Sequence, residues 1–256
     1  MIARTIPLKQ SSITALLLGG MLLLPVAGRS EDSPSDWSFA VSPYLWVAGI
    51  ELETSLPAVP PSTPTVDQFD TRICAGAMLT AAAQYRSVGL FVDFAWLRLD
   101  TEALNPGPAF SAVNLRSDFI HTTAALTYQL PSCGKLHAEL LAGARVWHAE
   151  EELTFADGAL PGFNSSSDET WADPILGASL RYDLSPRWFL ASKGTVGGFG
   201  VSADLAWEVF AGVGYHFNDW GSAVLGYRYL HEDYARDNFT FNLDTHGFLL
   251  GFGFCF

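Results

Sequence analysis

The sequence predicts an all-β protein: a transmembrane, antiparallel, up-and-down β-barrel. Three observations support this fold class. Apolar residues alternate with small or polar ones along most of the chain, the connections between the alternating segments are long and short in turn, and the chain ends on the aromatic residue Phe256. Strands of about ten residues with this alternation place one face on lipid and the other in the barrel lumen.

We expect ten strands. They lie at residues 37–50, 73–86, 88–101, 115–130, 135–152, 171–184, 187–197, 203–217, 221–233 and 240–256. The last strand shows the alternation best, because its even-numbered positions from Phe248 to Phe256 are large and apolar while Gly247, Gly251 and Gly253 stand between them. A barrel of eight strands is the alternative, if 88–101 or 187–197 is not a strand.

The connections predict which end of the barrel faces which compartment. Long connections are expected at 51–72, 102–114, 153–170, 198–202 and 234–239, and short ones near Ser87, at 131–134, 185–186 and 218–221. Outer-membrane barrels have short periplasmic turns and longer outer loops. Aromatic residues at lipid-facing positions then form two girdles at the membrane boundaries. The periplasmic girdle comprises Tyr85, Tyr128, Tyr182, Trp188, Tyr215 and Phe256, and the outer one Trp96, Trp207, Tyr229 and Phe248.

The N-terminus predicts export. Basic residues Arg4 and Lys9 precede an apolar run at 13–27, and small residues follow it. This three-part pattern is typical of a secretory signal peptide. We therefore expect residues 1–30 to be removed and residues 31–256 to form a single barrel domain in the cell outer membrane.

Composition excludes some classes of protein and partner. The formal net charge of −13 opposes nucleic-acid binding, which needs a basic face. The 49% hydrophobic content excludes a disordered chain. Cys74, Cys133 and Cys255 are too few and too far apart for a disulfide framework, and they stand in no metal-binding pattern. We expect no cofactor and no metal centre.

Two levels of resemblance follow from these patterns. The terminal segment Gly251-Phe-Gly-Phe-Cys-Phe256 resembles the assembly signal of bacterial outer-membrane β-barrel proteins. This resemblance implies recognition by the outer-membrane assembly machinery. The residues that would form the signal are Gly251, Phe252, Phe254 and Phe256. The segments 173–177 (DPILG), 194–200 (GTVGGFG) and 226–230 (GYRYL) are similar to a porin-like family of barrels. That family often has an acidic residue where Thr195 stands and a basic one where Cys255 stands, and it implies no particular activity.

Charged residues of inward parity are the candidate functional residues. They are four acids and four bases: Asp93, Glu139, Arg145, Asp173, Arg181, Lys193, Glu208 and Arg228. Charges confined in a lumen are expected to pair, because a lone buried charge is costly. Two functions fit such a lumen: a narrow porin-like conduit for small solutes with a preference for cations, and a non-conducting structural or surface-interaction barrel filled by ion pairs.

A hydrolase is the third alternative, because some small outer-membrane barrels are enzymes. Omptin proteases use acids and a His at the outer rim, and lipid A deacylases use a His and a Ser two residues apart. None of the six histidines here is followed two positions later by Ser. Without a nucleophile beside an oriented base, we expect no enzymatic activity.

The outer side is strongly acidic. Sixteen acids fall on outer loops or adjoining strand ends: Glu51, Glu53, Asp67, Asp70, Asp100, Glu102, Glu150, Glu151, Glu152, Asp157, Asp168, Glu169, Asp204, Glu232, Asp233 and Asp237. Two interpretations stay open. The acids form a solvated rim, or they bind divalent cations that bridge to lipopolysaccharide, since carboxylate oxygens suit Ca²⁺ and Mg²⁺. The expected partners are therefore outer-membrane lipid and lipopolysaccharide, with the protein as a monomer.

Overall fold

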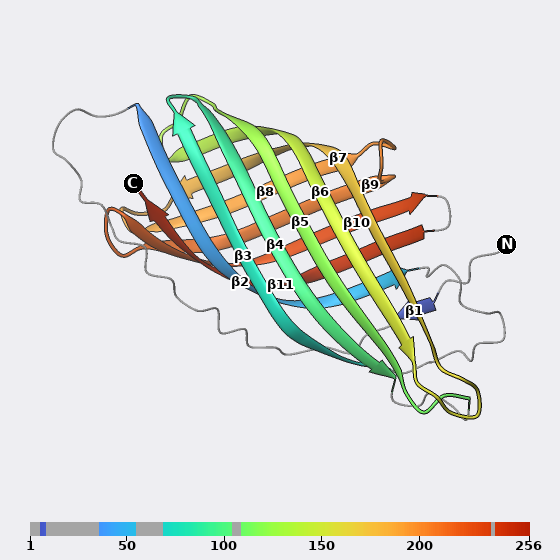
Figure 1. Cartoon of the computed structure of the whole chain (residues 1–256). Coiled ribbons are helices and arrows are strands. Elements are labelled where there is room, and N and C mark those ends of the chain that lie inside the picture. Colours follow the sequence, from blue (N-terminus) through green and yellow to red (C-terminus); the bar gives the residue numbers. More distant parts are fainter. Residues whose placement is uncertain (1–5, 9–35, 55–68, 104–108, 237–238) are drawn as a thin grey trace.

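A computed structural model describes residues 6–8, 36–54, 69–103, 109–236 and 239–256 of the chain (Figure 1). The strands are β1 (Ile6–Leu8), β2 (Trp37–Thr54), β3 (Phe69–Tyr85), β4 (Val88–Ala103), β5 (Val113–Gln129), β6 (Leu136–Phe155), β7 (Phe163–Asp183), β8 (Trp188–Gly198), β9 (Leu205–His216), β10 (Gly221–Arg236) and β11 (Phe239–Cys255). In the described part of the chain, no helix has the length and apolar character needed to cross a membrane.

Ten strands, β2 to β11, form a closed antiparallel barrel. Each pairs with its neighbour in sequence, and β2 closes the sheet by pairing with both β11 and β3. The predicted fold class and strand number are confirmed, and the eight-strand alternative is wrong because β4 and β8 are both paired on two sides. The short strand β1 pairs with the outer end of β2 and lies inside the predicted signal peptide, whose removal stays a prediction.

The strands extend further than predicted at the end with the longer connections, which we call the long-hairpin end. The long connection expected at 153–170 is wrong, because β6 continues to Phe155 and β7 already begins at Phe163. Phe155 and Phe163 stack at a ring distance of 4.4 Å, and Phe110 covers Phe155 at 4.8 Å. These rings bury one another, which maintains strand pairing beyond the apolar belt. The proline-rich part of the expected loop 51–72 lies outside the described residues.

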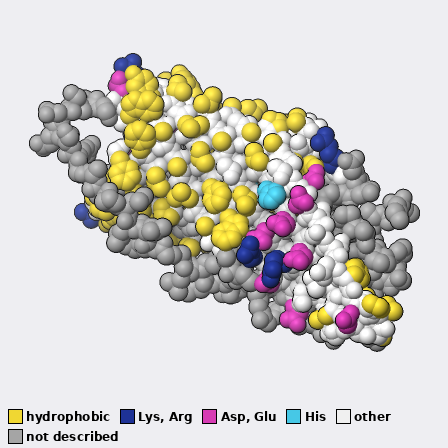
Figure 2. All heavy atoms as spheres, viewed as in Figure 1, with side chains coloured by type: hydrophobic (Ala, Val, Ile, Leu, Met, Phe, Trp, Pro, Cys, Tyr) yellow, Lys and Arg dark blue, Asp and Glu magenta, His cyan; other side chains and the backbone are white. Residues whose placement is uncertain are grey.

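Apolar side chains cover the outer wall toward the opposite, short-turn end of the barrel. Figure 2 shows hydrophobic side chains over that end and charged ones gathered toward the long-hairpin end. Leu225 and Phe248 are 57% and 65% exposed, as expected for side chains that face lipid. Six aromatics predicted for the girdles are also largely exposed: Tyr85, Tyr128, Tyr182, Trp188, Phe248 and Phe256.

Arg98 and Arg116 face outward beyond this apolar belt, on the surface of β4 and β5. Arg98 pairs with Asp118 at 2.9 Å, and Arg116 pairs with Asp100 at 3.1 Å. Both pairs join β4 to β5 across the strands. Their exposure predicts that each contributes less than about 1 kcal/mol to stability.

The seam between β2 and β3 is the shortest of the barrel wall. Its pairing runs from Trp37↔Tyr85 to Pro43↔Leu79, and no further β2–β3 pair is present among the described residues. Beyond this point β2 stays paired with β11, and β3 with β4. The two strands therefore separate over the half of the barrel nearer the long-hairpin end.

Candidate functional site in the barrel lumen

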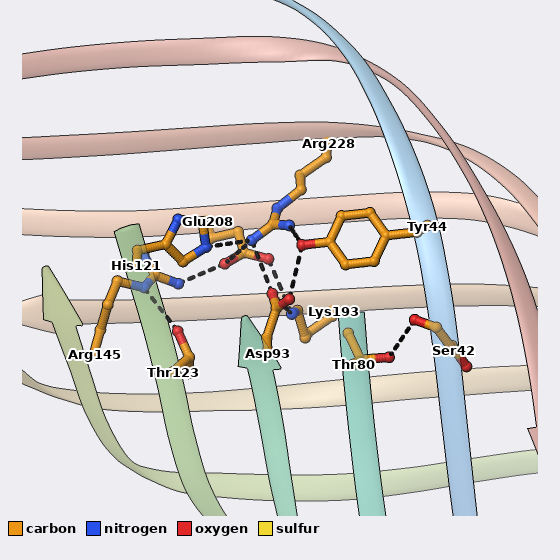
Figure 3. A network of polar contacts seen from close by, with 10 residues as sticks. All are labelled: Ser42, Tyr44, Thr80, Asp93, His121, Thr123, Arg145, Lys193, Glu208 and Arg228. Atoms are coloured by element: carbon orange, nitrogen blue, oxygen red, sulfur yellow. Dashed lines mark hydrogen bonds and ion pairs between the residues drawn. The ribbon is translucent and has the colours of Figure 1, made fainter. Parts of the chain in front are cut away.

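An ion-paired layer crosses the middle of the lumen. Asp93 of β4, Arg145 of β6, Glu208 of β9 and Arg228 of β10 are each at most 2% exposed. Lys193 of β8 joins them and is 17% exposed. Figure 3 shows these side chains converging from different strands on one point inside the barrel. Alternation places all five on the inward face of their strands.

Glu208 is the centre of the layer. Its carboxylate accepts a hydrogen bond from Nη2 of Arg145, and it lies 3.0 Å from Nζ of Lys193 and 3.2 Å from Nη2 of Arg228. Asp93 is the second carboxylate, 3.0 Å from Nη2 of Arg228 and 3.7 Å from Nζ of Lys193. Three bases and two acids thus meet, which gives the layer a formal net charge of +1.

Neutral side chains complete the layer. The hydroxyl of Tyr44 donates to Oδ1 of Asp93 at 2.8 Å and accepts from Nη1 of Arg228 at 2.8 Å. Nε of Arg145 donates to the hydroxyl of Thr123 at 3.0 Å. Such additional hydrogen bonds are needed, because the attraction within a buried ion pair alone does not reliably offset the loss of hydration.

Three predicted lumen charges take no part in the ion pairs of this layer. Arg181 is near the short-turn end, where it donates to Asp183 at 2.9 Å and contacts His216 at 2.8 Å. Glu139 accepts a hydrogen bond from Ser179 at 3.3 Å. Asp173 is fully buried and accepts a hydrogen bond from the backbone N–H of Ala203 at 2.7 Å. Asp173 thereby holds the β8–β9 turn, in which Gly198 and Gly200 have φ of 83° and 71°.

Three acids assigned to the outer rim face the lumen instead. Glu151 and Glu232 are fully buried, and Glu232 accepts a hydrogen bond from Nε1 of Trp171 at 3.0 Å. Glu169 accepts one from the hydroxyl of Tyr234 at 3.1 Å. Their assignment to a solvated rim is therefore wrong. Parity could have found Glu151, because it stands an even number of positions after Arg145 and so shares its face.

An apolar cavity lies directly beyond the ion-paired layer, in the half of the lumen nearer the long-hairpin end; we call it the outer cavity. Its volume is about 60 Å³. It is lined by Trp46, Ala48, Ile50, Met78, Ala95, Leu97, Phe119, His121, Trp147, Leu230, Leu243 and Thr245. Beyond it, Trp171 stacks on Trp147 and on Tyr234 at ring distances of 6.0 and 4.4 Å.

The described residues contain no group of three or more His, Cys, Asp or Glu side chains that could hold a metal ion. Three histidines near the long-hairpin end face outward, where His231 contacts Asp244 at 2.9 Å, His246 contacts Tyr227 at 2.7 Å and His148 contacts Thr170 at 2.8 Å. Cys133 and Cys255 are exposed and free. The absence of an enzymatic activity stays a prediction.

The predicted assembly signal ends the closing strand of the barrel. The backbones of Phe256 and Phe39 exchange two hydrogen bonds, of 2.8 and 3.1 Å. Phe252 and Phe256 are 42% and 61% exposed on the outer wall, and Phe254 stacks on Trp220 at 6.0 Å. Gly251 is buried opposite Tyr44. The role of these residues in assembly stays a prediction.

Comparisons with known proteins concern the fold. No protein-family model matches the chain, and no curated protein matches it significantly. Among solved structures it is similar to the outer membrane protease OmpT from Escherichia coli, at 9% identity over 88% of this chain and 99% of that one, with a TM-score of 0.49. It is also similar to the β domain of the Bordetella autotransporter BrkA (12% identity, 85% and 97% covered, TM-score 0.46). A third similar structure is the attachment invasion locus protein Ail of Yersinia pestis (11% identity, 87% and 100% covered, TM-score 0.35). These proteins differ in activity, so the comparisons assign none. The predicted resemblance to outer-membrane β-barrel proteins holds at the level of the fold, because β2 closes the sheet by pairing with both β11 and β3.

Proposed function

We propose that this chain is a closed-lumen outer-membrane barrel that acts as a surface-interaction or binding protein, and that it is not an open conduit. The observation that carries the proposal is the ion-paired layer. Four of its charged side chains are at most 2% exposed. Opening a path between them would separate buried charges from their partners, which costs about 3–5 kcal/mol for each pair broken.

The sign of the layer also opposes the predicted preference for cations. Cation-selective constrictions are lined by rings of acidic side chains. Here Arg145, Lys193 and Arg228 outnumber Asp93 and Glu208 in the ion-paired layer. A passing cation would meet a net positive charge in a region of low dielectric constant.

The outer wall supports the proposed location in the outer membrane. A soluble barrel would present charged residues to water, but this wall exposes large apolar side chains such as Leu126 and Leu176, at 66% and 55%. We expect the protein in the outer-membrane fraction, as a monomer whose unboiled and boiled samples migrate differently on a denaturing gel. Recovery from the soluble periplasmic fraction would contradict this location.

Planar-bilayer conductance tests the closed lumen. Wild-type protein should give no stable current steps, whereas the double variant Glu208→Ala/Arg228→Ala should give them, because it removes two side chains from the layer. The matched control is Glu139→Ala/Arg181→Ala, which also removes one acid and one base from inward positions but leaves the layer intact, and it should stay silent. Stable steps from the wild-type protein would refute the closed lumen.

A narrow conduit is the second candidate, and one observation favours it. Lys193 is 17% exposed, so solvent reaches the layer at this side chain. If the wild-type protein conducts, Lys193→Met should change the size of the current step or its ion selectivity. An unchanged step in this variant would place the path elsewhere in the lumen.

A further inference from the structure

The outer cavity has walls that suit a flat apolar molecule. Trp46, Phe119 and Trp147 supply aromatic surface, and the rings of Trp147 and His121 lie 4.8 Å apart. Its volume of about 60 Å³ is several times what one water molecule needs, which is about 10–15 Å³. An apolar cavity of about 150 Å³ with an aliphatic and aromatic lining stays dry and binds benzene, and the lining of the outer cavity is of the same kind.

Two hydrogen-bond donors in this wall have no acceptor. Nε1 of Trp46 and Nε1 of Trp147 are buried and have no hydrogen-bond partner among the described residues. Both indoles line the cavity. A buried donor without a partner loses about 1–3 kcal/mol of hydration, so an occupant that offers an acceptor atom would be favoured over one that does not.

We propose that the outer cavity binds a small, mainly apolar and flat molecule that carries a hydrogen-bond acceptor, such as an aromatic carbonyl compound. The ligand would stack on the aromatic walls, and its oxygen would accept a hydrogen bond from an indole N–H of Trp46 or Trp147. This inference rests on the proposed closed lumen, because the ion-paired layer forms the floor of the site.

The place of the cavity in the wall gives such a ligand access from the side of the barrel. Trp46, Ala48 and Ile50 of β2 and Met78 of β3 all line the cavity. All four lie beyond Pro43↔Leu79, where the pairing of β2 with β3 ends. An apolar molecule dissolved in the outer leaflet could therefore reach the cavity without passing the ion-paired layer.

Calorimetric titration of the purified full chain in detergent micelles tests the proposal, with the heat of dilution into empty micelles subtracted. The two probes are benzaldehyde and styrene, which match in size and shape and differ in the acceptor oxygen. Benzaldehyde should bind more tightly than styrene. Trp46→Phe or Trp147→Phe keeps an aromatic ring and removes the donor, so at least one of them should weaken benzaldehyde binding by about threefold to tenfold and leave styrene binding unchanged.

A variant that fills the cavity provides the decisive comparison. Ala95→Leu adds side-chain volume at the cavity wall and should abolish binding of both probes. Ala81→Leu adds the same volume on the lipid-facing side of β3 and should bind both as the wild-type does. A shift on boiling in gel electrophoresis verifies that each variant is folded. Unchanged binding to Ala95→Leu, or no binding to the wild-type, would overturn the proposal. If conductance is absent but no probe binds, the closed lumen stands and the ligand site fails; current through the wild-type protein would instead contradict the closed lumen.

Discussion

Glu208 should matter more to the stability of the barrel than Arg228, although both side chains are almost fully buried. Glu208→Gln removes the carboxylate that contacts all three bases of the layer. Asp93 then remains as the single acid among those five side chains, and Arg145 keeps Thr123 as its nearest partner. The formal charge of the layer rises from +1 to +2. Leaving a buried charge without its partner costs about 3–5 kcal/mol, and we expect a loss of stability in this range.

Arg228→Met has a milder effect in the same layer. Each carboxylate keeps a base, because Lys193 lies 3.0 Å from Glu208 and 3.7 Å from Asp93. The layer becomes formally neutral, and the loss is that of the hydrogen bonds that Arg228 makes to charged groups and to Tyr44. Because Lys193 stays beside both carboxylates, no buried charge loses its last partner, and the net loss is about that of one hydrogen bond to a charged group, ~1.5–3 kcal/mol. We therefore expect Arg228→Met to destabilise the barrel less than Glu208→Gln does.

Equilibrium unfolding by urea in lipid vesicles, followed by tryptophan fluorescence, measures both free energies of unfolding. The control is Arg181→Met, which breaks an ion pair at a guanidinium that is 42% exposed and should cost less than about 1 kcal/mol. If Arg228→Met proves as destabilising as Glu208→Gln, the reasoning from net charge and shared partners is wrong.

Three further predictions concern the wall and the surface. Deletion of Phe256, or Phe256→Asp, should lower the amount of protein inserted in the outer membrane without lowering its secretion; normal membrane levels would refute the assembly role. In a background with the native cysteines replaced by serine, a cysteine pair at Val41 and Ala81, which face each other across β2 and β3, should form a disulfide on mild oxidation. A cysteine pair at Leu45 and Ala77, which would face each other if the β2–β3 pairing continued, should form no disulfide. Efficient disulfide formation there would disprove the separation of the two strands. Glu150 stands opposite both Asp118 and Asp168 on the outer surface, so Glu150→Gln should raise the free energy of unfolding by about 0.2–1 kcal/mol at low ionic strength. Added Mg²⁺ should stabilise the wild-type protein more than this variant. An equal effect of Mg²⁺ on both proteins would argue against cation bridging at this position.

Alternation alone predicted much of the lumen. Asp93, Arg145, Glu208 and Arg228 were expected to point inward from their spacing, and the structure buries all four. Alternation could not show that they meet. Parity assigns a face but not a height along the barrel, and height depends on the stagger between strands, which is set by pairing and not by a strand's own residues. Arg181 and Glu139 have the same parity as the layer and lie at a different height, where Asp183 and Ser179 are their partners.

The sequence by itself determined the fold class, the number of strands and the face on which most strand side chains lie, because a period of two is a local property of a strand and survives in any register. The tertiary structure decided where pairing continues and where it ends. The stacking of Phe155 on Phe163 extends β6 and β7 into a segment predicted as a long connection. Strands β2 and β3 separate beyond Pro43 although both remain strands. The outer cavity is likewise a property of closure, since its lining comes from β2, β3, β4, β5, β6, β10 and β11. Residues so far apart in sequence become neighbours only when the sheet closes on itself, and no local pattern encodes that distance.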